Sequence, residues 1–547
     1  MTPSERAALT AWIQDKLKAT VLSVHDLTRH AEGFSWETYT FTAEWRSDQQ
    51  ATRHGFALRR EPAEGLLPPY DARRDHQLHR AVLDRSSVPV PGLHWLETDR
   101  RVLGRPFYVM DQVSGIVPVP WKPNDPRVFP DEEARARLGR HFVDVLADIH
   151  AIDLGSTERR PRSPRAGISL PSGAPGHTGA DVVPPAITEI LSDSGADTDD
   201  LARGEVARWA DVVERSAMVR EPLLDAAVLW LEGNVATSGR RALVHGDYRI
   251  GNVMVGDDGL INAVFDWELA HIGDPVFDLA WASLKLYGGR SGLMSRLLPI
   301  AEGLRRYTDR TGLEVDPAVF RFWTVFCHLR ALAPYLQATQ AFQSGRTHDT
   351  RLANMGHQSG HLMKFLAEEL GLRATPSARS GTPDTSDPDG EDAEGDATMM
   401  QNTPERLLRG AAEAVRDVLA QVTDPDPFVR SQLRATAELL DNLAPRIEWS
   451  AADLTTLIAR VRTVLEEASA ASQGRVPRAA AVLATPVDDT SVATLIAQRD
   501  AHLEALRDVQ AWLADTPAHP DLQIAVEQLL AWQIETDLAA LRAGSAA

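Results

Sequence analysis

One stretch, residues 243–281, restricts the fold of this chain more than any other. It reads LVHGDYRIGNVMVGDDGLINAVFDWELAHIGDPVFDLAW. Two short apolar runs, 252–255 and 260–265, flank a Gly-Asp-Asp-Gly turn, and this arrangement predicts a β-hairpin. A hairpin brings the start of its first strand beside the end of its second strand, so Asn252 should lie near Asp266.

Oxygen-bearing side chains gather at one end of this predicted hairpin. Asp247 lies five residues before Asn252, in the loop that leads into the first strand, and Asp266 follows the second strand. Two carboxylates and one amide oxygen suit Mg²⁺, which in proteins takes one or two carboxylates together with substrate phosphates. The pattern therefore predicts a magnesium site that also holds a phosphorylated ligand.

The spacing of these residues matches a known catalytic loop. Residues 245–252, HGDYRIGN, contain H-x-D-x-x-x-x-N, the pattern of the protein-kinase catalytic loop, which a metal-binding Asp follows one hairpin later. With the surrounding LVHGD, GNVMV, DWE, HIGDP and DLAW, the stretch resembles the aminoglycoside phosphotransferase and choline kinase-like family of small-molecule kinases. Within this family, these motifs are most similar to those of the branch of kinase-like domains attached to some acyl-CoA dehydrogenases.

This resemblance implies a role for each residue of the motif. Asp247 would accept the proton of the acceptor hydroxyl, and Asn252 and Asp266 would hold Mg²⁺ on the phosphates of ATP. His245 would help to fix the loop. Asp278 would brace the catalytic loop from below, although a helix N-cap remains the alternative for this residue.

The resemblance also implies nucleotide contacts in the N-terminal region. Residues 29–37 would form the loop over the ATP phosphates, where Gly33 and Ser35 approach the nucleotide. A plain hairpin turn is the alternative. Met110 and Gln112 would lie in the last strand of the N-lobe and its hinge, where backbone groups face the adenine, although a buried strand and a turn explain them equally well.

A phosphate-binding base is expected on the strand near residue 59. By position, Arg59 would bind the α- and β-phosphates, and Asp75, in a predicted helix over residues 70–83, would be its acidic partner. This pair differs from the Lys–Glu pair of protein kinases. A surface salt bridge is the alternative, and Arg60 and Arg74 compete for the phosphate-binding role.

Length and composition predict more than one domain. Within 547 residues, we expect a bilobal protein-kinase-like α+β fold followed by a separate all-α helical bundle. The N-lobe would cover residues 1–112, beginning with a helix capped by Ser4, and the C-lobe residues 113–371. Residues 372–402, rich in Pro, Gly, Ser, Thr and acids, predict a flexible linker. Apolar stripes at helical spacing predict a bundle of about five helices over residues 403–547.

Charge and cysteine content exclude several classes of protein. The formal net charge of −20 disfavours a nucleic-acid-binding surface and a polybasic membrane patch. The single cysteine, Cys327, excludes an internal disulfide framework, and no signal peptide or membrane span is evident, so we expect a cytoplasmic protein. The expected partner is a small hydroxyl-bearing molecule, and the helical bundle could mediate a homodimer or a protein contact.

The function expected from sequence is an ATP- and Mg²⁺-dependent phosphotransferase acting on a hydroxyl group of a small molecule. The resemblance suggests a hydroxyacyl-CoA or another hydroxylated metabolite as the acceptor. The alternative is a catalytically silent nucleotide-binding regulator or scaffold that acts through the helical bundle. A protein kinase is disfavoured because the sequence lacks an evident D-F-G and A-P-E activation segment.

Overall fold

The computed structural model describes most of the chain. The described residues are 1–19, 21–30, 35–47, 50–63, 65–66, 69–119, 124–158, 184–218, 221–347, 349–372, 404–421, 427–443, 451–487 and 492–545. They group into two compact units. One unit contains Met1–Trp209 and Asn234–His328, and the other contains Ala210–Gly233 and Leu329–Ala547. The predicted linker lies almost wholly outside the described residues, and the predicted lobe and domain boundaries stay predictions.

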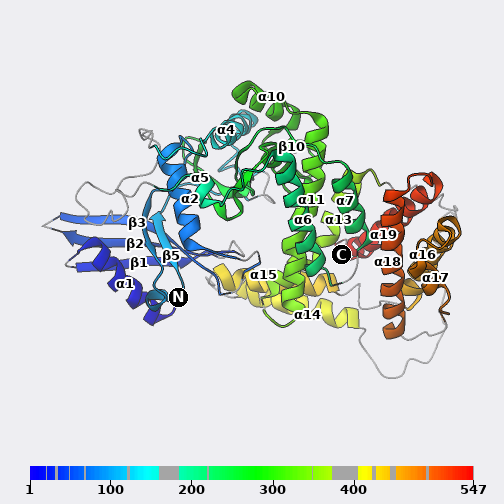
Figure 1. Cartoon of the computed structure of the whole chain (residues 1–547). Helices are drawn as coiled ribbons and strands as arrows, with labels where there is room; N and C mark the ends of the chain where they lie inside the picture. The colour runs from blue at the N-terminus through cyan, green and yellow to red at the C-terminus, as the bar shows by residue number, and fades with distance from the viewer. Residues whose placement is uncertain are drawn as a thin grey trace. The chain divides into compact units, whose positions relative to one another are not determined.

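The first unit begins with a helix and a five-stranded antiparallel sheet of order β1-β2-β3-β5-β4 (Figure 1). Its elements are α1 (Pro3–Leu17), β1 (Val21–Arg29), β2 (Glu37–Ser47), β3 (Gln50–Arg60), α2 (Ala72–Arg85), β4 (Leu93–Glu97), α3 (Arg100–Leu103) and β5 (Phe107–Asp111). The predicted helix over residues 70–83 is therefore shifted by two residues at each end. Asp71 caps α2, since its side chain accepts hydrogen bonds from the amides of Arg73 and Arg74.

The two faces of this sheet have different neighbours because side chains alternate along each strand. On one face, Phe56 and Leu58 of β3 pack in a core with α1. On the other face, Ala57 belongs to a core that includes α2 and the catalytic region. The helix α1 is capped by Thr2 rather than Ser4, because Thr2 and Glu5 form a reciprocal capping box.

The rest of the first unit is mainly helical, with short two-stranded ladders. Its elements are α4 (Glu132–His150), α5 (Ile187–Ile190), α6 (Thr198–Ser216), β6 (Ala242–Val244), η1 (Ile250–Asn252), β7 (Val253–Val255), β8 (Ile261–Val264), η2 (Trp267–Leu269), β9 (His271–Gly273), α8 (Val276–Ala282), α9 (Lys285–Gly288), β10 (Leu293–Met294), β11 (Leu298–Pro299) and α10 (Ile300–Thr311). The helices α6 and α11 (Pro317–Gln343) continue past the residues assigned to this unit. The strands β7 and β8 pair antiparallel, which confirms the predicted hairpin.

In the described residues of the second unit, all regular secondary structure is helical. Its helices are α7 (Pro222–Gly233), α12 (Thr350–His357), α13 (Ser359–Leu370), α14 (Pro404–Gln421), α15 (Pro427–Leu443), α16 (Ala451–Ser472), α17 (Pro477–Leu483), α18 (Val492–Asp515) and α19 (Pro520–Ser545). One apolar core of this unit joins α16, α17, α18 and α19. The expected all-α C-terminal region is confirmed, with the short α17 in addition to the five predicted helices. None of the helices in the described part of the chain combines the length and hydropathy that crossing a bilayer requires.

Candidate active site

The loop that carries the H-x-D-x-x-x-x-N pattern is held from beneath by one buried carboxylate. Asp278 of α8 accepts hydrogen bonds from the backbone amides of His245 and Gly246, at 2.7 and 2.9 Å. The Nε2 atom of His150, at the end of α4, lies 3.1 Å from the same carboxylate. Asp278 lies inside α8, whose N-cap is Pro275, so the N-cap interpretation is wrong and the bracing position is confirmed.

Close packing of the loop requires a glycine beside Asp247, the candidate catalytic aspartate. Gly246 has a φ of 82°, and a Cβ added there would lie 2.3 Å from the carbonyl oxygen of Leu269. Gly239 has a similar φ of 72°, but a Cβ there would meet nothing within 4 Å. The two glycines therefore form a matched pair, which separates backbone strain from the close contact.

We expect Gly246→Ala to destabilise the protein more than Gly239→Ala. Both variants pay about 1–2 kcal/mol for an L-residue in the left-handed region. Only Gly246→Ala adds the overpacking cost, about 1–3 kcal/mol. Urea unfolding of both variants measures the difference, and equal destabilisation would contradict the packing at Leu269.

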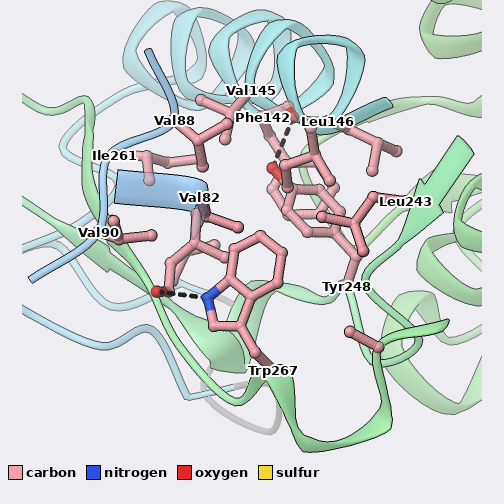
Figure 2. Packing of buried hydrophobic residues seen from close by; sticks show 14 of the residues in the cluster. Val82, Val88, Val90, Phe142, Val145, Leu146, Leu243, Tyr248, Ile261 and Trp267 are labelled. Carbon is pink, nitrogen blue, oxygen red and sulfur yellow. Dashed lines mark hydrogen bonds between the residues drawn. The ribbon is translucent and has the colours of Figure 1, made fainter. Parts of the chain in front are cut away.

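Aromatic residues fix the loop to the hydrophobic core (Figure 2). Tyr248, which is fully buried, donates a hydrogen bond from its hydroxyl to the carbonyl oxygen of Phe142 at 2.8 Å. Trp267, directly after Asp266, packs in the same core. The residues next to Asp247 and Asp266 are thus anchored in one rigid core, which limits the positions that the two carboxylates can take.

The carboxylate of Asp247 is oriented by three donors. The indole Nε1 of Trp281 donates to Oδ1 at 2.8 Å, and Nδ2 of Asn252 donates to Oδ2 at 2.7 Å. Nε of Arg249 lies 3.2 Å from Oδ1. The Asp247 side chain is 19% exposed, so it remains accessible to a ligand. This geometry suits a carboxylate that orients a hydroxyl group and accepts its proton.

His245 is buried and both of its ring nitrogens are engaged. Nδ1 accepts a hydrogen bond from the amide of Asp247 at 3.2 Å, and Nε2 donates to the carbonyl oxygen of Phe265 at 2.9 Å. Burial lowers the pKa of His245 below its ordinary value. These contacts fit a neutral imidazole that positions the loop, which agrees with the supporting role expected for it.

The hairpin brings Asn252 and the segment before Asp266 together. The amide of Phe265 donates to the carbonyl oxygen of Asn252 at 2.9 Å, so the predicted proximity is confirmed for the backbone. Nδ2 of Asn252 donates hydrogen bonds to Asp247, so Oδ1 of Asn252 is the atom that could ligate a metal. Asp266 has a left-handed φ of 63° and directs a 40% exposed carboxylate toward Arg59.

Arg59 pairs with different carboxylates from the one expected. Its Nη2 atom lies 2.8 Å from Oδ1 of Asp266 and 3.0 Å from Oε2 of Glu268. Asp75 instead accepts a hydrogen bond at 2.6 Å from the hydroxyl of Tyr108, and its Oδ1 atom is buried without a hydrogen-bond partner. The charge of Asp75 still raises the pKa of Arg59, so the two residues are electrostatic neighbours, but the direct ion-pair partners of Arg59 are Asp266 and Glu268 instead of the expected Asp75.

Arg60 and Arg74, the two alternatives to Arg59 as the phosphate-binding base, occupy different positions in the structure. Arg60 lies on the opposite face of the sheet and pairs with Glu5 at 2.7 Å and with Glu37. It is therefore excluded from the phosphate side. Arg74 donates to the carbonyl oxygens of Glu268 and Ala270, at 3.3 and 2.9 Å, and thereby supports the loop after the hairpin.

The other expected nucleotide contacts are only partly placed by the structure. Gly33 lies outside the described residues. Ser35 lies close enough to the Glu268 carboxyl to oppose part of the rise in its pKa, so the end of the expected loop approaches the acid that pairs with Arg59. Met110 pairs with Ala57 within the sheet. The amide of Gln112 donates to the carbonyl oxygen of Gly55, so this amide is not a free donor for adenine.

Two residues in direct contact with Asp247, Arg249 and Trp281, are not among the site residues expected from sequence. Arg249 lies inside the catalytic-loop motif, and Trp281 ends the DLAW segment. Arg249 is two residues from Asp247 and Trp281 is 34 residues from it, and neither residue type by itself suggests a contact with this carboxylate. Trp281 follows Asp278 by three residues on α8, so the helix that supports the loop also brings the indole to Asp247.

The donor set fits a magnesium ion. Asp247, Asn252 and Asp266 offer oxygen atoms, which Mg²⁺ prefers. Burial, together with the charge of Asp266, raises the pKa of the Glu268 carboxyl to about 8. The acids are thus crowded enough to disfavour full ionisation, and a bound cation would relieve this crowding.

A comparison with protein-family models gives the identity of this arrangement. Residues 26–323, more than half of the chain, match the model of the phosphotransferase enzyme family. The chain belongs to this phosphotransferase family. The match spans the sheet, the catalytic loop and the hairpin, so the resemblance seen in the sequence and the kinase-like α+β fold are confirmed.

The curated relatives of this phosphotransferase are longer proteins, and the match covers only a part of each. Acyl-CoA dehydrogenase family member 10 of Mus musculus is 27% identical over 280 residues, which are 51% of this chain and 22% of that protein. Probable acyl-CoA dehydrogenase IBR3 of Arabidopsis thaliana is 25% identical over 366 residues, 62% of this chain and 40% of that protein. The chain therefore spans less than half the length of either relative, and the expected branch is confirmed.

A solved structure of similar type is described as an aminoglycoside phosphotransferase from Ralstonia eutropha. It is 20% identical, covers 67% of this chain and 98% of its own, and superposes with a TM-score of 0.47. The assignment of this phosphotransferase to its family rests on the family model and on the motif geometry.

Proposed function

We propose that this phosphotransferase is a small-molecule kinase that transfers the γ-phosphoryl group of ATP to a hydroxyl group. The observation that carries the proposal is the oriented, partly exposed carboxylate of Asp247, held by Trp281 and Asn252 beside the hairpin that bears Asp266. Such transfer depends mainly on positioning and on charge neutralisation, and this cluster of fixed side chains offers both.

In the proposed reaction, Asp247 accepts the proton of the acceptor hydroxyl. The hydroxyl oxygen forms its bond to the γ-phosphorus while the bond from that phosphorus to the bridging oxygen breaks, and ADP leaves with the electron pair. Mg²⁺, when bound, would neutralise charge on the phosphates, and Asn252 and Asp266 are the residues proposed to hold it. Arg59, now paired with Asp266 and Glu268, is proposed to turn to the phosphates.

The acceptor is the open part of the proposal. Hydroxyacyl-CoA esters are the first class to test, because the curated relatives are named as acyl-CoA dehydrogenases. Other hydroxylated metabolites are the second class. The helical C-terminal region is proposed to mediate self-association or a protein contact, and neither nucleic acid nor a membrane is proposed as a partner.

We expect Asp266→Ala to abolish Mg²⁺-dependent binding of ATP. The variant loses the carboxylate proposed to hold the ion and one partner of Arg59. Titration calorimetry of ATP with and without Mg²⁺ measures the effect. Asp257→Ala, an exposed acid in the turn of the same hairpin, is the control and should bind like the wild type.

Two outcomes of this titration would change the proposal. Unchanged binding by Asp266→Ala would remove Asp266 from the metal site. Binding of MgATP by the wild type, without ADP release for any hydroxyl acceptor in a broad screen, would instead favour the alternative of a silent nucleotide-binding regulator.

A further inference from the structure

A second cluster of ligand-type side chains lies in the same unit but on the other side of its sheet. His54 of β3, His94 of β4 and Asp111 at the end of β5 bring their potential ligand atoms within 4.8 Å of one another. Nε2 of His54 and Nε2 of His94 lie 2.8 and 2.6 Å from Oδ1 of Asp111. Three neighbouring strands thus direct two imidazoles and one carboxylate to one point.

The strand register explains why His54 and Asp111 meet. Phe56 is the cross-strand partner of Asp111, and His54 lies two residues before Phe56, so all three side chains share one face. Phe56 belongs to the core that includes α1. Arg59 is an odd number of residues away on the same strand and faces the candidate active site. The cluster is therefore separated from the catalytic residues by the sheet.

An irregularity in β4 directs the third side chain to the cluster. Leu93 pairs with Met110 and Trp95 pairs with Val109, so His94 is an extra residue in β4. Such bulges change the direction of a side chain, and they are favoured next to functional sites. Leu93 and Trp95 consequently belong to different cores although they are only two residues apart.

The hydrogen bonds within the cluster leave one buried acceptor unused. Asp111 is 3% exposed, and both imidazoles approach its Oδ1 atom, whereas Oδ2 has no hydrogen-bond partner. A buried carboxylate oxygen without a partner is costly. The rings of Phe56 and Trp95, with centroids 5.2 and 5.4 Å from that of His94, restrict access of water. A cation bound at this point would use the unsatisfied oxygen.

We propose that His54, His94 and Asp111 form a binding site for a divalent transition-metal ion, with Zn²⁺ as the probe. Two imidazole nitrogens and one carboxylate are a ligand set for such ions, with a further position open to water. On binding, each Nε2 atom gives its proton to Nδ1 or to solvent, and its lone pair goes to the metal. The ion joins β3, β4 and β5 and stabilises the sheet from the side away from the catalytic loop.

The test is zinc binding by the full-length protein prepared without a histidine tag. After treatment with a chelator and dialysis, the wild type should bind one Zn²⁺ per chain in titration calorimetry and in elemental analysis. His54→Gln should weaken this affinity by at least 100-fold. His54 is suited to substitution because its side chain is 13% exposed, which limits the effect on folding.

His25→Gln is the matched control, because His25 is a 47% exposed histidine on β1 of the same sheet. It should bind Zn²⁺ like the wild type. Thermal unfolding gives a second measurement, since Zn²⁺ should raise the midpoint of the wild type and of His25→Gln but not that of His54→Gln or Asp111→Asn. Zinc affinity or a thermal shift that is the same in the wild type and in His54→Gln would overturn the proposal.

Discussion

Replacing Asp247 with alanine should lower kcat for phosphoryl transfer by about 10²- to 10⁴-fold, the usual contribution of a general base. The affinity for MgATP should remain close to that of the wild type, because Asn252 and Asp266 are still present. Steady-state kinetics with an active acceptor and calorimetry with ATP measure the two quantities separately. A variant that keeps more than about a tenth of the wild-type kcat would reject the role of base.

The contacts of Asp247 allow a sharper version of this experiment. Trp281→Phe removes the indole donor 2.8 Å from Oδ1 while it keeps an aromatic ring in the core. It should reduce kcat less than Asp247→Ala, because the carboxylate remains and only its orientation is relaxed. If both variants lower kcat equally with unchanged folding, orientation of the carboxylate rather than its basicity limits the reaction.

Replacing Asp278 with asparagine should destabilise the protein by about 3–5 kcal/mol, the cost of breaking a buried, hydrogen-bonded charged network. The two carboxylate oxygens of Asp278 accept one backbone amide each, from His245 and Gly246. Asparagine has one acceptor oxygen, so its NH₂ group would face one of these N–H donors. Urea unfolding measures the loss, and Asp309→Asn, an exposed acid on α10, should change stability little.

The same network predicts how stability depends on pH. Burial alone would raise the pKa of Asp278, but the hydrogen bond from His150, the charge interactions with His150 and His245, and the amide of His245 outweigh it and hold the pKa below its ordinary value. A depressed pKa in the folded state stabilises the protein above the unfolded pKa, about 4, and this stabilisation is lost at lower pH. The difference between wild type and Asp278→Asn should therefore shrink as the pH falls below about 4. A difference that stays constant down to pH 3 would contradict this linkage.

The local elements of the candidate site could be predicted because short-range rules determine them. The Gly-Asp-Asp-Gly turn between two apolar runs specifies the hairpin, and the hairpin specifies that Asn252 approaches the segment before Asp266. Alternation along β3 likewise specifies that Arg59 and Arg60 face opposite sides of the sheet. The motif spacing identified Asp247, and the family model agrees with the resemblance.

Contacts between distant elements could not be predicted in this way. Arg59 and Asp75 have a suitable separation and opposite charges, yet Arg59 pairs with Asp266 and Glu268, about two hundred residues away. Which acid reaches a guanidinium depends on side-chain length and on how three elements pack together, and spacing in the sequence does not specify that packing. The contact of Trp281 with Asp247 was missed for the same reason.

The sequence by itself determined the family of this protein, the hairpin with its aspartates and the helical character of the C-terminal region. These features depend on periodicity, turn residues and motif spacing, which are local properties of the chain. Only the tertiary structure decided which carboxylates surround Arg59, which donors orient Asp247, and that His54, His94 and Asp111 meet. These three residues are far apart in the sequence, and only strand register and a bulge in β4 bring them together, so the sequence alone does not reveal the cluster.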